Sequence, residues 1–137
     1  MTPGADVLRL PPGMADAIVA HAREASPREC CGVIGGSGGD LHELRRVANA
    51  HPGLDFYTMD DTALFKTYRE FDGRGWEFAV IYHSHPTSAA FPSSSDVALA
   101  AWPDACYVIC SLEAPDWPSL RGFRIVDGVV SEVLIVA

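Results

Sequence analysis

The sequence predicts one α+β domain in which a largely antiparallel sheet packs with about three helices. Its 137 residues are 48% apolar, which is enough for one hydrophobic core and too few for two ordinary domains. Runs rich in β-branched and aromatic residues alternate with stretches of helical apolar spacing, and the turn signal Asp127-Gly128 joins two of these runs as a hairpin. We therefore expect residues 1–137 to form a single domain.

The first third of the chain predicts a helix followed by a β-hairpin. Apolar residues recur at three- and four-residue spacing across Pro11–Ala25, which is typical of an amphipathic helix, and Ser26-Pro27 ends it. The apolar run Cys31–Ile34 predicts a strand. A glycine-rich turn over residues 35–40 then leads to Leu41–Val47, the expected partner strand.

The middle of the chain predicts a loop, a short strand, a helix and a central strand. Asn49–Leu54 is expected to be a loop and Phe56–Met59 a short strand. The acidic pair Asp60-Asp61 begins a helix that runs to about Phe71, because acidic side chains favour the positive N-terminal end. Trp76–His83 is apolar at nearly every position, which predicts a central strand.

The last part of the chain predicts a small helix and three further strands. Residues 86–92 form a loop of small residues, after which Asp96–Ala101 reads as a helix that Pro103 stops. The expected strands are Cys106–Leu112, Leu120–Val126 and Val129–Val136.

Charge and cysteine content narrow the class of function. Eighteen acidic against ten basic side chains give a formal charge of −8, which argues against a nucleic-acid partner and gives no reason to expect a membrane partner. No apolar run approaches the ~20 residues that span a bilayer, and the start of the chain lacks the pattern of a secretory signal, so we expect a cytoplasmic protein. The four cysteines lie in apolar runs without paired CxxC motifs, which favours buried thiols over a zinc cluster.

A metal-ligand pattern begins at the end of the expected central strand. His83 and His85 are two residues apart, so on a strand they point to the same face with Cβ atoms roughly 6.5–7 Å apart, close enough to share one ion. Asp96 follows in the first turn of the next expected helix, and the loop before it is long enough to fold that turn back to the strand end. Two imidazoles and one carboxylate leave a fourth position for water, which is typical of a catalytic Zn²⁺ site.

A zinc hydrolase also needs a proton acceptor and a donor for the oxyanion. Ser93 lies three residues before Asp96, so the same turn can place it beside the metal. Glu29 precedes an expected apolar strand, where partial desolvation would raise its pKa and suit it to proton transfer. The spacing of residues does not by itself bring Glu29 to the histidines.

These positions resemble a known family. The order of a glutamate, a His-x-His pair, a serine after seven intervening residues and an aspartate three after that serine is similar to the JAMM (MPN+) metalloprotease motif. The matching residues are Glu29 with Cys30-Cys31-Gly32, His83-Ser84-His85-Pro86, Ser93 and Asp96. The resemblance implies that His83, His85 and Asp96 bind zinc. It also implies that Glu29 is the general acid and base, that Ser93 helps to stabilise the tetrahedral intermediate, and that the fold is a cytidine-deaminase-like α/β sandwich.

The flanking residues resemble one branch of that family. The short chain and the sequence Pro-Arg-Glu-Cys-Cys-Gly around Glu29 are similar to bacterial Mec-type enzymes. That resemblance implies a partner, a small ubiquitin-like sulfur-carrier protein with a C-terminal Gly-Gly tail. It also implies a reaction, the release of cysteine or another amino acid joined to that tail.

Each of these residues also has a purely structural interpretation. Ser93 and Asp96 have the spacing of a helix capping box, which would leave the carboxylate only partly free for a metal. Tyr57 and Met59 are expected in the core, with contact to a substrate tail as the alternative. Cys30 and Cys31 are poor candidates for a nucleophile, because the best histidine partners are assigned to the metal.

Three other functions remain open at this point. They are a metal-free scaffold of the same fold that binds ubiquitin-like proteins, a DNA-repair-associated relative, and a peptidase that acts on other peptides. The complete set of five motif residues argues against the scaffold, and the acidic balance argues against DNA binding. Only trial of substrates separates the third.

Overall fold

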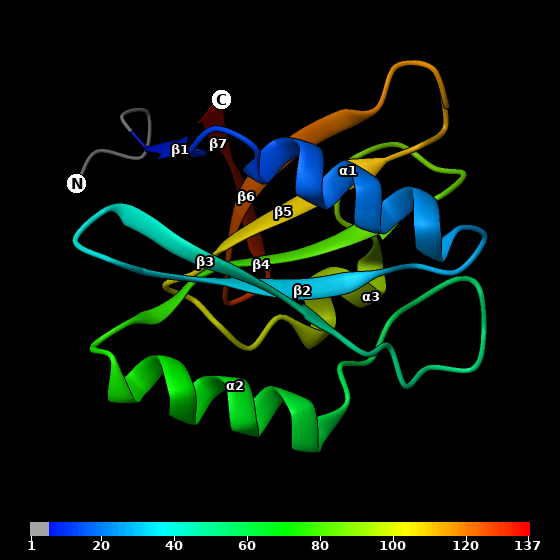
Figure 1. Cartoon of the computed structure of the whole chain (residues 1–137). Helices are drawn as coiled ribbons and strands as arrows, with labels where there is room; N and C mark the ends of the chain where they lie inside the picture. The colour runs from blue at the N-terminus through cyan, green and yellow to red at the C-terminus, as the bar shows by residue number, and fades with distance from the viewer. Residues whose placement is uncertain (1–5) are drawn as a thin grey trace.

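Helices cover both faces of a mixed seven-stranded sheet in this computed structural model, which describes residues 6–137 (Figure 1). The helices are α1 (Met14–Ala25), α2 (Asp61–Gly73) and α3 (Ser94–Leu99). The strands are β1 (Val7–Arg9), β2 (Cys31–Ser37), β3 (Asp40–Val47), β4 (Glu77–His85), β5 (Cys106–Ser111), β6 (Ser119–Val126) and β7 (Val129–Val136).

The strand order is β1-β7-β6-β5-β4-β2-β3, and most neighbouring strands are antiparallel. Only β1 with β7 and β4 with β5 pair in parallel among the described residues. The predicted helix-flanked, mainly antiparallel α+β sheet is therefore confirmed. A parallel pair needs a crossover, and the connection from β4 to β5 carries α3. This crossover returns α3 to the end of β4, where the candidate ligands lie.

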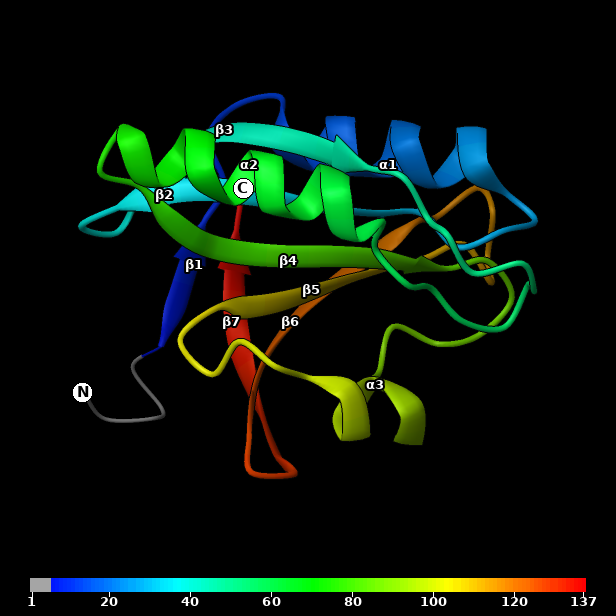
Figure 2. The same ribbon diagram turned by 90° about the horizontal axis from the view of Figure 1, so that it is seen from below.

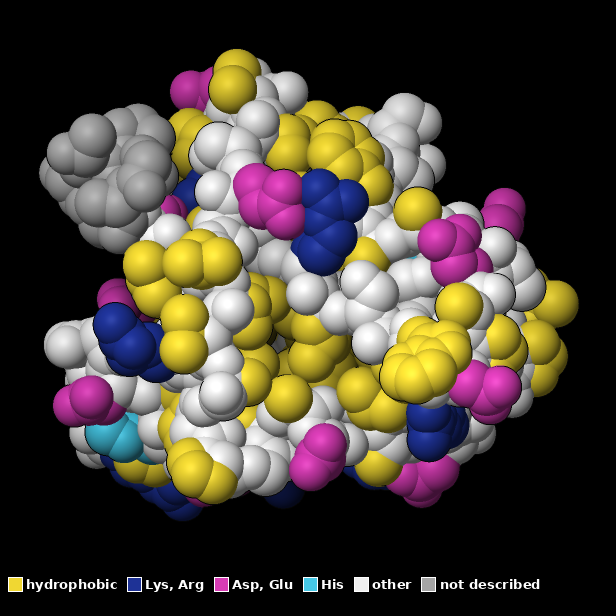
Figure 3. Space-filling view, turned by 90° about the horizontal axis from the view of Figure 1, so that it is seen from above, with side chains coloured by type: hydrophobic (Ala, Val, Ile, Leu, Met, Phe, Trp, Pro, Cys, Tyr) yellow, Lys and Arg dark blue, Asp and Glu magenta, His cyan; other side chains and the backbone are white. Residues whose placement is uncertain are grey.

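The sheet separates two hydrophobic cores. On one face, α1 contributes the fully buried Ile18 and Ala22 to a cluster that includes Tyr82 of β4. On the other face, α2 contributes Phe71, and Val97 of α3 packs against the same cluster. The view from below shows α2 and α3 on that second side (Figure 2). Seen from above, hydrophobic side chains surround a hollow in the middle of the visible face (Figure 3).

Several strands and helices extend beyond the predicted ranges. β2 continues through Gly35 to Ser37. A Cβ at Gly35 would lie 2.8 Å from the Phe71 ring, so the glycine lets α2 pack closely against this part of the strand. β4 continues past His83 to His85, which pairs with Ser111 of β5.

The two longer helices also have shifted ends. α1 begins at Met14 rather than Pro11, and α2 ends at Gly73 rather than Phe71. The N-cap of α2 is Asp60, which confirms that the acidic pair marks the start of this helix.

The predicted strand Phe56–Met59 is wrong. This segment makes only an isolated bridge between Asn49 and Met59. Its backbone groups bond to the segment around Asn49 and not to a strand of the sheet: the Thr58 N–H donates to Asn49 Oδ1 at 3.0 Å, the Phe56 carbonyl accepts from Asn49 Nδ2 at 3.5 Å, and the Thr58 carbonyl accepts from the Ala50 N–H at 2.7 Å. β1 was not predicted, because three residues are too short for a periodic pattern.

The predicted hairpin between β6 and β7 is confirmed. Asp127 and Gly128 have φ values of 50° and 78°, and positive φ at both central residues is the geometry of the two-residue turn that suits the twist of antiparallel strands. Among the described residues, no helix has both the length and the apolar character to cross a membrane.

Candidate active site

The end of β4 brings two imidazoles together. Alternation along the strand puts His83 and His85 on the same face, as their spacing predicts, and their Nε2 atoms lie 3.1 Å apart. His83 is 1% exposed and His85 is 5% exposed. Two neutral rings at this distance, both removed from water, are arranged to share a bound group.

Helix α3 adds a carboxylate to the pair. Asp96 Oδ2 lies 3.2 Å from His83 Nε2 and 3.1 Å from His85 Nε2, so the three atoms form a nearly equilateral triangle. Ligand atoms about 2.0–2.1 Å from a tetrahedral zinc ion are about 3.4 Å from one another. The triangle therefore has the dimensions of a zinc ligand set.

The hydrogen bonding of His85 favours a cation at this triangle. His85 Nδ1 donates to the Ala89 carbonyl at 2.8 Å, so the neutral ring turns the lone pair of Nε2 toward Asp96 Oδ2. Two lone pairs at this distance repel each other unless a positive charge lies between them. Burial opposes a positive charge on His85, but the Asp96 carboxylate, the Ala89 carbonyl and the charge of Glu29 together outweigh burial and raise the pKa of the ring. The same two imidazoles overcome burial and hold the pKa of Asp96 far below its usual range.

Unpartnered buried atoms gather at the same place. Within residues 6–137, the buried side-chain atoms without a hydrogen-bond partner are Glu29 Oε1, His83 Nδ1 and Asp96 Oδ1. Buried polar groups in proteins are nearly always bonded. The donor set and these free atoms fit a bound zinc ion with a reacting group beside it.

The start of β2 places Glu29 beside the histidines, which sequence spacing could not do. Cys31 is paired across from His83, so the carboxylate two residues earlier comes to the end of β4. One ligand atom from each of Glu29, His83 and His85 lies within 4.8 Å of the other two. Glu29 is 6% exposed, and burial raises the pKa of its carboxyl to about 7 despite the opposing effect of His85. This carboxyl can both accept and release a proton near neutral pH.

Ser93 and Asp96 form the capping box that their spacing predicts. Ser93 Oγ accepts from the Asp96 N–H at 3.1 Å, and the Ser93 N–H donates to Asp96 Oδ2 at 2.9 Å. Because Ser93 is the N-cap, α3 begins at Ser94 and ends at Leu99, in place of the predicted Asp96–Ala101. The same carboxylate oxygen caps the helix and faces both histidines, so the two interpretations coexist. Ser93 is exposed, and as an acceptor in the cap it keeps its hydroxyl proton free to donate.

Two residues beside the site were not assigned to it from the sequence, although contact with a substrate tail was the alternative interpretation of Tyr57. The Tyr57 ring stacks on His83 with 4.5 Å between ring centres, and this half-buried tyrosine belongs to the wall of a pocket rather than to the closed core. Asn49 Nδ2 donates to the Glu29 carbonyl at 2.9 Å, which ties the segment just before β2 to the loop that follows β3. Asn49 is the only asparagine in the chain, and the preference of asparagine for turns was the sequence signal that could have identified its role.

The cysteines are expected to be inert in the folded protein. All four are buried and free, and burial raises the pKa of Cys30 to about 11 and of Cys31 to about 12, so neither is a thiolate at neutral pH. We expect a thiol reagent such as dithionitrobenzoate to label four thiols in denaturant and essentially none in the native protein at pH 8. Rapid labelling of Cys30 or Cys31 in the native protein would revive a nucleophilic cysteine.

Comparison with known proteins identifies relatives over most of the chain. The family model described as prokaryotic homologs of the JAB domain matches residues 11–125. The CysO-cysteine peptidase of Mycobacterium tuberculosis is 41% identical over 128 residues, which cover 92% of this chain and 88% of the relative. The desampylase of Haloferax volcanii is 32% identical over 117 residues, which cover 74% of this chain and 81% of the relative.

A solved structure has the same fold. The crystal structure of a JAB1/MPN domain protein from Archaeoglobus fulgidus matches with a TM-score of 0.59 and 20% identity, over 91% of this chain and 95% of that one.

Proposed function

Because the chain belongs to the family of prokaryotic homologs of the JAB domain, we propose that it is a zinc-dependent peptidase. This membership, with the JAB1/MPN neighbour, confirms the family and the fold that the motif predicts. The observation that carries the proposal is the convergence of His83 Nε2, His85 Nε2 and Asp96 Oδ2 to within 3.2 Å of one another. Glu29 lies beside them with a pKa near that of an effective general base.

His83, His85 and Asp96 are the residues that would hold zinc. When bound there, zinc supplies Lewis-acid chemistry, since it polarises a scissile carbonyl and makes water acidic enough to be deprotonated near neutral pH. The Ala89 carbonyl keeps Nε2 of His85 directed at the site through its bond to Nδ1. The capping bond from the Ser93 N–H orients the Asp96 carboxylate in the same way.

Glu29 and Ser93 act on the substrate and the attacking water. The Glu29 carboxylate takes one proton from the water and then gives it to the amine that leaves, so the residue returns to its starting state. Oε1 of Glu29 makes no other hydrogen bond that would compete for this proton. The Ser93 hydroxyl donates to the scissile carbonyl oxygen as charge develops on it, an interaction worth about 3 kcal/mol where comparable donors have been removed.

The substrate we propose is a small ubiquitin-like sulfur-carrier protein whose C-terminal Gly-Gly tail carries a further amino acid. Hydrolysis after the second glycine releases cysteine or another residue. The names of the Mycobacterium and Haloferax relatives support a substrate of this kind. A non-catalytic scaffold is disfavoured by Glu29, because a buried carboxyl without a partner stabilises no part of the fold.

We also propose that residues 1–137 act as one peptidase domain in the cytoplasm. The seven strands that the structure describes belong to one sheet, which supports the single domain. All four buried cysteines are free thiols, and a reducing compartment suits such a protein.

Mass spectrometry of a carrier conjugate tests the proposed function. The substrate is a recombinant ubiquitin-like sulfur carrier that ends in Gly-Gly and to which cysteine has been joined. With the zinc-loaded protein, we expect the conjugate to lose the mass of one cysteine residue, and we expect no change after chelation until zinc is restored. An intact conjugate in the presence of zinc-loaded protein would reject this substrate.

A further inference from the structure

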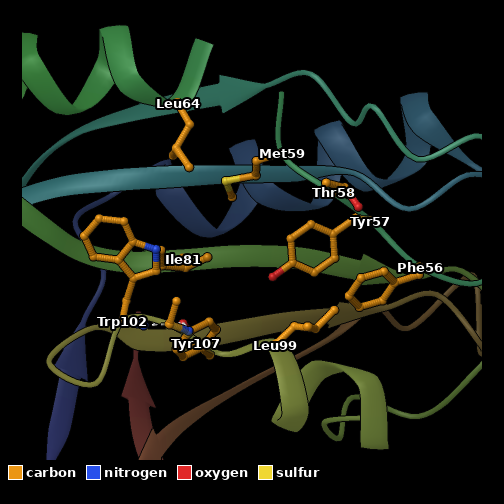
Figure 4. A pocket seen from close by; sticks show the side chains of 10 residues that line it. Phe56, Tyr57, Thr58, Met59, Leu64, Ile81, Leu99, Trp102 and Tyr107 are labelled. Atoms are coloured by element: carbon orange, nitrogen blue, oxygen red, sulfur yellow. Dashed lines mark hydrogen bonds between the residues drawn. The ribbon is translucent and has the colours of Figure 1, made fainter. Parts of the chain in front are cut away.

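An apolar pocket of about 190 Å³ lies next to the candidate active site (Figure 4). We call it the Ile81 pocket. Ile81 of β4 and Tyr107 of β5 are buried, pair in register and form its floor. Tyr57, Leu64 and Trp102 line its walls, and the exposed Leu99 stands at its rim.

The pocket and the metal ligands share one face of β4. Ile81, His83 and His85 alternate along the strand, so their side chains point to the same side. At about 3.3 Å per residue, the pocket floor lies roughly 7–13 Å along the strand from the two histidines. The Tyr57 ring connects the two places, because it stacks on His83 and also lines the pocket.

An extended peptide covers the same distance with two to four residues. When the bond after Gly-Gly lies at the metal ligands, the side chains just upstream of the two glycines are therefore the ones that reach the pocket. The glycines themselves have no side chain to place there.

The chemistry of the pocket selects one side of the substrate. In the described part of the chain, its lining includes no lysine, arginine or histidine that could pair with a carboxylate. The released amino acid carries such a carboxylate and is poorly matched to the pocket. The lining is mostly aliphatic and aromatic, and the Tyr57 hydroxyl and the Trp102 indole nitrogen both point toward Ile81 (Figure 4). These two donors suit a peptide carbonyl next to an apolar side chain.

We infer that the Ile81 pocket is a specificity site that binds an apolar side chain from the two residues preceding Gly-Gly in the carrier tail. The inference rests on the proposed function, because it takes the position of the scissile bond from it. It adds a requirement that neither the metal ligands nor Glu29 imposes: a carrier with small polar residues at both positions binds weakly.

Binding of product-like peptides tests the inference without any need for turnover. Acetylated peptides that end in Gly-Gly carry leucine at either of the two preceding positions, and the matched peptide carries serine at both. They are titrated into the ¹⁵N-labelled, zinc-loaded protein while the indole N–H signal of Trp102 is followed. We expect a saturable shift with at least one leucine peptide, and binding at least tenfold weaker with the serine peptide.

Two leucines of similar exposure supply the variant and its control. Leu99 at the pocket rim is 66% exposed and Leu134 on β7 is 63% exposed, so an aspartate at either position leaves the core intact. We expect Leu99→Asp to remove the preference for leucine and Leu134→Asp to keep it.

Three results would overturn the inference: no binding of either leucine peptide, equal binding of leucine and serine peptides, or an unchanged preference in Leu99→Asp. These results are independent of the carrier assay. If the conjugate is cleaved but the peptides show no preference for leucine, the proposed peptidase activity stands and the proposed role of the pocket is rejected. If the leucine peptides bind selectively but the conjugate stays intact, the role of the pocket stands and the proposed reaction is rejected.

Discussion

Replacing Glu29 with glutamine is expected to lower kcat for the carrier conjugate by about 10²–10⁴-fold while the protein keeps its zinc. Glutamine has the shape of glutamate but cannot accept and release a proton. Glu29 is not among the three atoms of the ligand triangle, so zinc content measured by mass spectrometry should remain at one per chain. Wild-type turnover in Glu29→Gln with zinc bound would exclude Glu29 as the base, and a loss of zinc would make it a ligand.

The pH profile gives a second measurement on the same residue. The base is active when ionised, and burial raises the pKa of Glu29 to about 7. For the wild-type protein, kcat/KM is therefore expected to rise with pH through about 7 and to level off above it. A wild-type profile that is flat from pH 5 to 8 would contradict the assignment.

Replacing Asp96 with asparagine is expected to remove zinc from the protein without unfolding it. The asparagine oxygen can still accept from the Ser93 N–H, so the capping box keeps its geometry. The negative charge that faces both histidines is lost. Loss of groups that only support a ligand weakens metal binding by about 10–100-fold, so we expect at least about 100-fold weaker zinc binding here. Metal analysis after dialysis and the Tm of the apoprotein measure the two effects separately.

Ser93→Ala is the matched control for Asp96→Asn. It removes the cap hydroxyl, which costs about 0.5–2 kcal/mol of stability, and leaves the three ligand atoms in place. We expect this variant to have a lower Tm and an unchanged zinc content. Stoichiometric zinc in Asp96→Asn would show that the carboxylate is a cap and not a ligand.

Local patterns were sufficient to predict most of the fold. Helical spacing identified α1 and α2, and the two-residue turn at Asp127-Gly128 identified the last hairpin. The i, i+2 spacing predicted that His83 and His85 share a face, because that geometry depends only on the strand itself.

Features that depend on distant contacts could not be predicted in this way. The sequence predicts a turn at Gly35 and Gly36, whereas both residues lie within β2. Gly35 is needed there because the Phe71 ring of α2 occupies the space that a side chain would fill. Glu29 reaches the histidines only through the pairing of β2 with β4, so its place came from the family resemblance and not from spacing. Phe56–Met59 has strand-like residues, but its hydrogen bonds go to the Asn49 side chain and the Ala50 N–H and not to a strand of the sheet.

The hydrogen bonds around Asn49 bear on how the loop beside the site can vary among related proteins. The Asn49 side chain accepts hydrogen bonds from the His51 and Thr58 N–H groups and donates to the Glu29 and Phe56 carbonyls. Arg28 donates to the carbonyls of Asn49 and His51. The residues between His51 and Phe56 belong to no strand of the sheet, so residues can be inserted there without changing the register of the strands. Lengthening or shortening this stretch would reshape the rim around the reacting groups while the groups themselves stay fixed. Natural selection can therefore retune partner choice and chemistry as nearly independent traits.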